Sequence, residues 1–368
     1  MNKKKDLAVL LVTGTVMLSL TLFAWFSPAK QYSDSERRAL ALFPALNSET
    51  VLNGSFMKDF ETYSQDQFPL RESFRRLKAL SARYLFAQKS NNDIYVADGH
   101  VSKLEYPLQE NMLDHAAGRF NHIYETFLVD TDVKTYFSIV PDKNYFLAKP
   151  NGYPGLDYDA LVALMRSKTE QMTYIDLFYL LSAEDYYHTD THWRQECIRD
   201  VAAELAAAMG AEHSGDFTEV TLDIPFYGVY TGQSALPLEP DTLTYLTNDV
   251  LEAAKVQYLG DDGLWKDGSL YDLAAAEGKD PYDLFLSGTE ALITIENPLA
   301  KTDKELVVFR DSFGSSITPL LLEGYAKITV VDIRYIQSDF VGAFVAFDDQ
   351  DVLFLYSTMM LNSSTALK

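Results

Sequence analysis

The C-terminal part of the chain alternates apolar, strand-like runs with helix-like segments, and this alternation constrains the fold more than any other feature. Two helix-like segments, SSITPLLLEGY and SDFVGAFVAF, lie between the later runs. Strands that are apolar at nearly every position are typical of parallel sheets covered by helices on both faces. We therefore predict an α/β fold with a mostly parallel sheet, built around the runs ALITIEN (291–297), ELVVFRDS (305–312), AKITVVDIR (326–334) and DVLFLYST (351–358).

The middle of the chain continues this alternation. A hairpin is predicted around Asp98-Gly99, because turn residues there separate two apolar stretches. The region 215–288 is rich in Gly and Asp and is expected to be a loop-rich insertion near the functional site. The other expected elements are a buried strand (133–141), a mixed segment (173–181) and helices over 113–129, 157–172 and 193–209.

Composition and charge exclude several classes of protein. The chain has 368 residues, of which 47% are hydrophobic, enough for one large core with an appendage. The formal net charge of −22 repels phosphate backbones, so we predict no nucleic-acid partner. A single cysteine excludes an internal disulfide.

The N-terminus predicts a membrane segment. Three lysines (Lys3, Lys4 and Lys5) precede the run Leu7–Phe26, which contains no charged residue. That length suffices for one helical span, and the preceding lysines place the N-terminus in the cytoplasm and the remainder outside. A cleaved signal peptide, giving a secreted protein, is the alternative. We expect a signal anchor (1–26), a helical neck (27–92) and a catalytic domain (93–368).

The neck has apolar residues at helical spacing on both sides of Pro69. Because proline interrupts helices, two helices are predicted, one on each side of DQFPLR. Asp66 and Arg71 flank this break and are interpreted as helix caps and a surface ion pair.

Ser312 occupies the most informative position for chemistry. It follows a buried strand and precedes a helix, and ligands of open parallel sheets bind at the carboxyl ends of strands. A serine hydroxyl becomes a nucleophile only beside a general base. Capping of the following helix is the alternative role for Ser312.

The stretch YYHTDTHW supplies a candidate base and a residue to orient it. In an extended segment, Asp190 and His192 would point the same way. A carboxylate next to an imidazole fixes its tautomer and stabilises the imidazolium. The alternative is that Asp190 or Thr191 only caps a helix that begins near Trp193.

Several motifs together resemble the DHHW family and the alginate O-acetylation proteins. The resemblance covers most of the chain, including YSQDQFPLRESF, SIVPDKNYF, YYHTDTHW, FYGVYTGQSA and LVVFRDSFGSSITPLL. It implies an SGNH hydrolase-like three-layer α/β/α sandwich behind a membrane anchor, with Ser312, His192 and Asp190 as the catalytic triad. Thr191 stands between Asp190 and His192, where the DHHW name has a further His, and Arg310 replaces the Gly of the usual Gly-Asp-Ser.

Five further residues are candidates for the site. Gly232 and Ser234 are candidate backbone donors to an oxyanion, and His188 is a candidate pocket residue. Lys143 either meets an anionic substrate group or is solvated, and Arg334 either lies at the edge of the site or pairs with Asp332. Because no third ligand joins His188 and His192 in the sequence pattern, we predict no metal site and no cofactor.

Three functions fit these observations. The first is a membrane-anchored O-acetyltransferase that modifies a cell-surface or secreted polysaccharide through an acyl-serine; for it, the resemblance implies a multi-spanning membrane acyltransferase partner. The second is a carbohydrate acetylesterase that uses the same triad with water as the acceptor. The third is a non-catalytic glycan-binding surface protein, which the high content of Tyr and Phe would suit.

Overall fold

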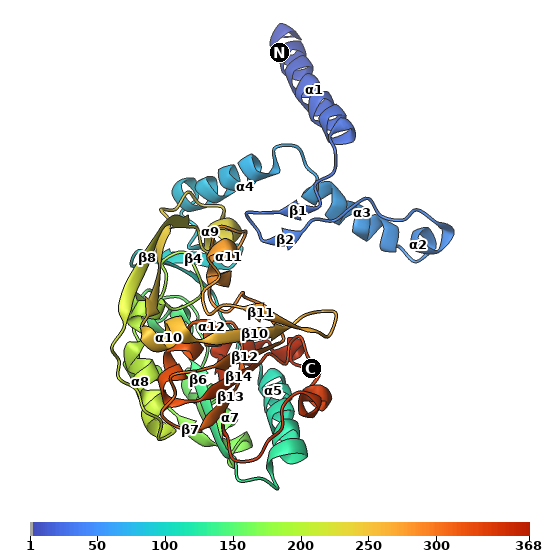
Figure 1. Ribbon diagram of the computed structural model, residues 1–368. Helices are drawn as coiled ribbons and strands as arrows, with labels where there is room; N and C mark the ends of the chain where they lie inside the picture. The colour runs from blue at the N-terminus through green and yellow to red at the C-terminus, as the bar shows by residue number, and fades with distance from the viewer. Residues whose placement is uncertain (1–2) are drawn as a thin grey trace. The chain divides into compact units, whose positions relative to one another are not determined.

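The computed structural model describes residues 3–368 and divides into two compact units. The neck unit comprises the chain up to Asn92 together with Thr231–Pro237. The second unit comprises Asp93–Tyr230 and Leu238–Lys368, and it is called the catalytic unit here because it holds the candidate residues Ser312, His192 and Asp190. The chain starts with helix α1 (Lys3–Phe26), which is long and apolar enough to cross a membrane (Figure 1). The first two residues of the expected 1–26 anchor lie outside the described residues.

The neck unit contains the two predicted helices, α3 (Ser55–Asp66) and α4 (Arg71–Leu80), on either side of Pro69. Leu70 adopts a left-handed conformation with φ of 56°, which turns the chain between them. The remaining regular elements are β1 (Tyr32–Ser33), β2 (Arg38–Ala39), α2 (Ser48–Leu52), the π-helical turn η1 (Ser81–Leu85) and β3 (Ser90–Asn91).

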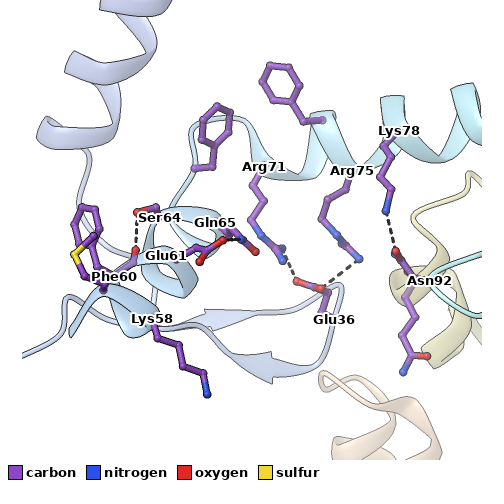
Figure 2. A pocket seen from close by; sticks show the side chains of 14 residues that line it. Glu36, Lys58, Phe60, Glu61, Ser64, Gln65, Arg71, Arg75, Lys78 and Asn92 are labelled. Atoms are coloured by element: carbon purple, nitrogen blue, oxygen red, sulfur yellow. Dashed lines mark hydrogen bonds and ion pairs between the residues drawn. The ribbon is translucent and has the colours of Figure 1, made fainter. Parts of the chain in front are cut away.

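A cluster of charged side chains holds the neck together. Asp66 is buried and accepts hydrogen bonds from both terminal nitrogens of Arg38, at 2.6 and 2.9 Å. Arg71 lies 3.5 Å from Asp66, and both Arg71 and Arg75 pair with Glu36 (Figure 2). The predicted Asp66–Arg71 pair is therefore present, but it belongs to a largely buried network and not to the surface.

The catalytic unit is built on an eight-stranded sheet with the order β11-β10-β12-β14-β13-β15-β6-β7. The neighbouring pairs from β14 to β7 are parallel, whereas β12, β10 and β11 join antiparallel at the other edge. This confirms the predicted mostly parallel sheet. The strands are β6 (Lys134–Val140), β7 (Thr173–Ile175), β10 (Lys255–Leu259), β11 (Trp265–Gly268), β12 (Leu292–Glu296), β13 (Glu305–Arg310), β14 (Lys327–Val331) and β15 (Asp351–Ser357).

Alternate residues of the central strands bury into two separate cores. Leu306 and Val308 of β13 pack in a core with α8 (Arg199–Ala208) and the segment after Ser312. Val307 and Phe309 pack in the other core with α5 (Glu110–Ile123) and α7 (Tyr158–Lys168). Because side chains of a strand alternate between faces, the sheet is covered on both sides, as Figure 1 shows for α8 and α5. The result is a three-layer α/β/α sandwich.

Smaller elements complete the catalytic unit. The predicted hairpin forms as β4 (Ile94–Ala97) and β5 (His100–Lys103), joined at Asp98 and Gly99. The others are β8 (Thr218–Phe226) and β9 (Asp241–Thr247), which pair antiparallel, and helices α6 (Lys143–Leu147), α9 (Val229–Ser234), α10 (Asp249–Ala253), α11 (Leu273–Ala276), α12 (Phe313–Ile317) and α13 (Thr358–Asn362).

Three expectations differ from the structure. The helix predicted over 193–209 begins only at Arg199, because residues 195–197 form a 3₁₀ turn. The segment predicted as a helix over 338–347 is a 3₁₀ helix that ends at Ala343. Part of the expected insertion over 215–288 belongs to the main sheet, because β10 pairs with β12.

Candidate active site

Ser312, His192 and Asp190 form one row of hydrogen bonds. The Nε2 atom of His192 lies 2.8 Å from the Ser312 Oγ, and its Nδ1 lies 2.6 Å from an Asp190 carboxylate oxygen. Asp190 is fully buried, and His192 is 9% exposed. Nucleophile, base and orienting carboxylate therefore have the relative geometry of a catalytic triad.

The helix-capping alternative for Asp190 and Thr191 is wrong. The helix starts at Arg199, and the Asp190 carboxylate instead accepts hydrogen bonds from the backbone and ring N–H groups of His192. The segment is a tight turn and not an extended strand. Asp190 and His192 therefore meet across the turn, and not because alternate residues of a strand point the same way. Ser312 likewise makes no side-chain cap to α12.

The second oxygen of Asp190 is held by the chain around Gly228. The backbone N–H of Val229 donates to it at 2.7 Å, and Gly228 donates to the Thr189 hydroxyl at 2.9 Å. A Cβ atom at Gly228 would overlap the backbone of Thr189 and Asp190. Only glycine therefore allows this close approach, which satisfies the buried carboxylate. Gly228 and Val229 were not among the predicted site residues, although both lie in the motif FYGVYTGQSA.

We expect Gly228→Ala to lower the turnover of an ester substrate by about 10²-fold, because the displaced backbone no longer holds Asp190 in place. Overpacking against buried backbone should also cost about 1–3 kcal/mol of stability. Ester hydrolysis and thermal unfolding measure the two effects. Gly118→Ala in α5 is the matched control, since a Cβ there meets no atom within 4 Å. Equal activity of the two variants would contradict this role for Gly228.

Aromatic and amide side chains fix the position of the His192 loop. The ring of Tyr282 stacks on the His192 imidazole, with centroids 3.7 Å apart and an angle of 6°. The indole N–H of Trp193 donates to the Ser316 hydroxyl at 2.8 Å, and the Gln195 amide donates to the Ser316 carbonyl at 2.7 Å. These contacts join the His192 loop to α12, the helix that directly follows Ser312.

Arg310, at the end of β13, is a buried structural cation. It is fully buried, pairs with Asp332 at 3.2 Å and donates to the Gly288 carbonyl at 3.2 Å. Arg334 binds the same carboxylate at 2.6 Å, so the structural ion pair considered for Arg334 is present. Both guanidinium groups are thus engaged with Asp332, which leaves a substrate-binding role for Arg334 without support from these contacts.

Lys143 is the first residue of α6, shortly after the end of β6, and it is not a solvated lysine. It is 2% exposed, and its Nζ donates to the carbonyls of Tyr187 and His188 at 2.8 and 3.1 Å. Burial lowers the pKa of Lys143 to about 7, although Asp190 and Asp241 oppose this shift. Its contacts support a role in holding the loop that leads to Asp190.

The buried Lys143 predicts a pH-dependent stability. Since its pKa is lower in the folded than in the unfolded chain, the unfolded chain binds more protons between about pH 7 and pH 10. Between pH 6 and pH 9, the free energy of unfolding of the wild type should therefore rise by roughly 2 kcal/mol relative to that of the Lys143→Met variant. Urea unfolding at several pH values measures this difference, and a difference independent of pH would contradict it.

The remaining candidates lie in other surroundings. Gly232 and Ser234 belong to the segment that groups with the neck unit. The Gly232 carbonyl accepts from Arg75 at 2.8 Å, and the Ser234 carbonyl accepts from Asn91 at 3.1 Å. These contacts serve the neck and lend no support to an oxyanion role. The ring of His188 meets that of His100, with centroids 4.4 Å apart.

Solved structures with the same fold cover most of this chain. A DHHW family protein from Eubacterium siraeum superposes with a TM-score of 0.61 at 21% identity, over 75% of this chain and 94% of that one. The chain has the fold of a DHHW family protein. This likeness agrees with the α/β fold class predicted from the sequence.

Two further solved structures are similar to this chain. Bacillus cereus PatB1 with a sulfonyl adduct has a TM-score of 0.57 at 18% identity, over 73% of this chain and 97% of that one. The O-acetyltransferase domain of Pseudomonas putida AlgJ has a TM-score of 0.44 at 14% identity, over 73% and 92%. No protein-family model and no curated protein matches the sequence.

Proposed function

We propose that this protein is an extracytoplasmic, membrane-anchored O-acetyltransferase that acts on a polysaccharide. The observation that carries the proposal is the row from Ser312 through His192 to Asp190, with hydrogen bonds of 2.8 and 2.6 Å. The position of Ser312 directly after a parallel strand is where such folds bind ligands.

The proposed reaction has two halves. The Ser312 Oγ attacks the carbonyl carbon of an acetyl ester while the His192 Nε2 takes the hydroxyl proton, and the imidazolium then protonates the departing donor oxygen. The acetyl group is now an ester on Ser312. In the second half, His192 takes the proton of a sugar hydroxyl, which attacks the ester, and returns the proton to the Ser312 oxygen. Asp190 holds the imidazole tautomer throughout.

The shared fold supports covalent chemistry of this kind. The PatB1 structure contains a sulfonyl adduct, and sulfonyl groups are captured by activated nucleophiles. Ser312, with its base in hydrogen-bond contact, is the corresponding candidate nucleophile in this chain.

We infer the location and the partners of the enzyme from α1 and from the family resemblance. Helix α1 has an apolar composition, and the lysines at its start favour an N-terminus in the cytoplasm. We propose that α1 anchors the catalytic unit outside the cytoplasm, with a secreted form after signal cleavage as the alternative. A multi-spanning membrane acyltransferase is the proposed source of acetyl groups, and a polysaccharide is the proposed acceptor.

Competition between sugar and water tests this function. The full chain in detergent would be incubated with an aryl acetate donor, with and without a panel of polysaccharides. We expect acetyl esters to accumulate on one polysaccharide while the Ser312→Ala variant forms none. Acetate release without any transfer would favour the acetylesterase. Binding of a glycan with neither reaction would favour the non-catalytic surface protein.

A further inference from the structure

Three potential metal ligands from separate segments meet outside the triad. His100 lies in β5, Glu184 in the short 3₁₀ turn 183–185, and His188 in the loop before Asp190. One ligand atom from each lies within 4.8 Å of the other two. The His100 Nε2 is 3.4 Å from a Glu184 carboxylate oxygen, and the rings of the two histidines are nearly perpendicular, at 86°.

His100 is an unusual residue at a buried position. It is 1% exposed, and its Nδ1 has no hydrogen-bond partner within residues 3–368. Its Nε2 lies at the long distance of 3.4 Å from the Glu184 carboxylate, and it is the ring nitrogen that would bind a metal ion beside Glu184.

The backbone of His188 is held in place by three hydrogen bonds. Its N–H donates to Asp241 at 2.7 Å. Its carbonyl accepts from the Val101 N–H at 2.8 Å and from Lys143 at 3.1 Å. The imidazole is therefore positioned beside His100 before any ligand binds, which reduces the entropic cost of binding. Lys143 is the nearby charge that opposes a cation, and the Asp241 carboxylate offsets it.

We propose that His100, Glu184 and His188 bind one divalent transition-metal ion of the Zn²⁺ type. Two imidazoles and one carboxylate are a common Zn²⁺ ligand set, with water at the fourth position. Tetrahedral coordination requires neighbouring ligand atoms about 3.3 Å apart. The Glu184 side chain is 75% exposed and has room to close the remaining gap.

A bound ion would join the β4–β5 hairpin to the loop that carries the triad. His188 precedes Asp190 by two residues, so the ion would restrict the segment that orients His192. Both ring nitrogens of His192 are already engaged with Asp190 and Ser312, and the metal site therefore does not use triad ligands. Its role would be to stabilise the loop and not to take part in acetyl transfer.

Zn²⁺ itself is the probe. The full chain in detergent, purified without a polyhistidine tag, would be titrated with Zn²⁺ by calorimetry and with Co²⁺ by visible absorption. We expect one ion per chain and a rise in Tm of about 5 °C at a hundredfold excess over the dissociation constant. The exposed side chains make His188→Ala and Glu184→Gln suitable variants, and each should weaken binding at least about tenfold.

Two controls separate this site from others. His122→Ala removes an exposed histidine that pairs with Asp339, and it should leave the affinity unchanged. Ser312→Ala should also bind Zn²⁺ normally, so that loss of acetyl transfer and loss of the metal site are distinguishable. Absence of stoichiometric binding would overturn the proposal, and so would binding that neither His188→Ala nor Glu184→Gln weakens.

Discussion

Ser312→Ala is expected to reduce hydrolysis of an aryl acetate by about 10⁴-fold or more, because the hydroxyl that forms the acyl-enzyme is gone. His192→Ala should have an effect of similar size, since the base lies 2.8 Å from that hydroxyl. The quantity to measure is kcat, with thermal unfolding as a check that each variant is folded.

The double variant sharpens this prediction. Residues that act as one unit are not additive, so Ser312→Ala/His192→Ala should be no slower than either single variant. Ser167→Ala and His122→Ala are matched controls. The Ser167 hydroxyl bonds within helix α7, and His122 bonds to Asp339. Both variants should retain full activity. A loss of kcat in the double variant equal to the product of the two single losses would show that the two residues act separately.

Asp190→Asn is expected to reduce kcat by about 10⁴-fold while leaving the shape of the site intact. One Asp190 oxygen accepts from His192 and the other accepts from Val229. An amide has only one acceptor oxygen, so its NH₂ group must face one of these donors. Facing His192, it forces the proton onto Nε2, which then no longer accepts the Ser312 proton. Facing Val229, it opposes a backbone N–H.

A matched substitution controls for the loss of charge. Asp157→Asn changes the N-cap residue of α7 and should keep normal activity, because asparagine is an equally good cap. Turnover should be measured for both variants over a range of pH. A loss of less than tenfold for Asp190→Asn would mean that Asp190 does not orient the base.

The sheet was predictable because its signal is local. Each of β13 and β15 is an apolar run with nearly every residue buried, and two-sided burial is what such runs indicate. The hairpin at Asp98-Gly99 was predictable for the same reason, since the turn residues themselves adopt the left-handed backbone.

The details of the site depend on contacts between residues far apart in the chain. The local sequence pattern does not contain information about such contacts. The pattern predicts Trp193 and Gln195 in the first turn of an α-helix, but their side chains bond to Ser316, and the α-helix begins only at Arg199. The sequence pattern predicts Lys143 as a surface residue at a strand end. In the structure it is buried, and its ammonium group donates to two carbonyls of the 187–188 segment.

In the motif FYGVYTGQSA, the predicted residues and the residues that hold Asp190 are different. Its importance was recognisable, but Gly232 and Ser234 were chosen because glycine and serine suit an oxyanion. The contacts with Asp190 come from Gly228 and Val229 at the other end of the motif. A backbone N–H donor does not depend on the type of side chain, so the sequence pattern does not mark Val229. The glycine at position 228, where the close approach leaves no room for a side chain, was the one available signal.

Intact mass spectrometry tests the central claim, that Ser312 is an activated nucleophile, most directly. The full chain would be treated with an aryl acetate or an arylsulfonyl fluoride, and the modified peptide would be mapped. The account predicts one acetyl or sulfonyl group on Ser312 in the wild type, none in Ser312→Ala and strongly reduced labelling in His192→Ala. Wild-type protein that remains unlabelled, or equal labelling of Ser312→Ala, would contradict it.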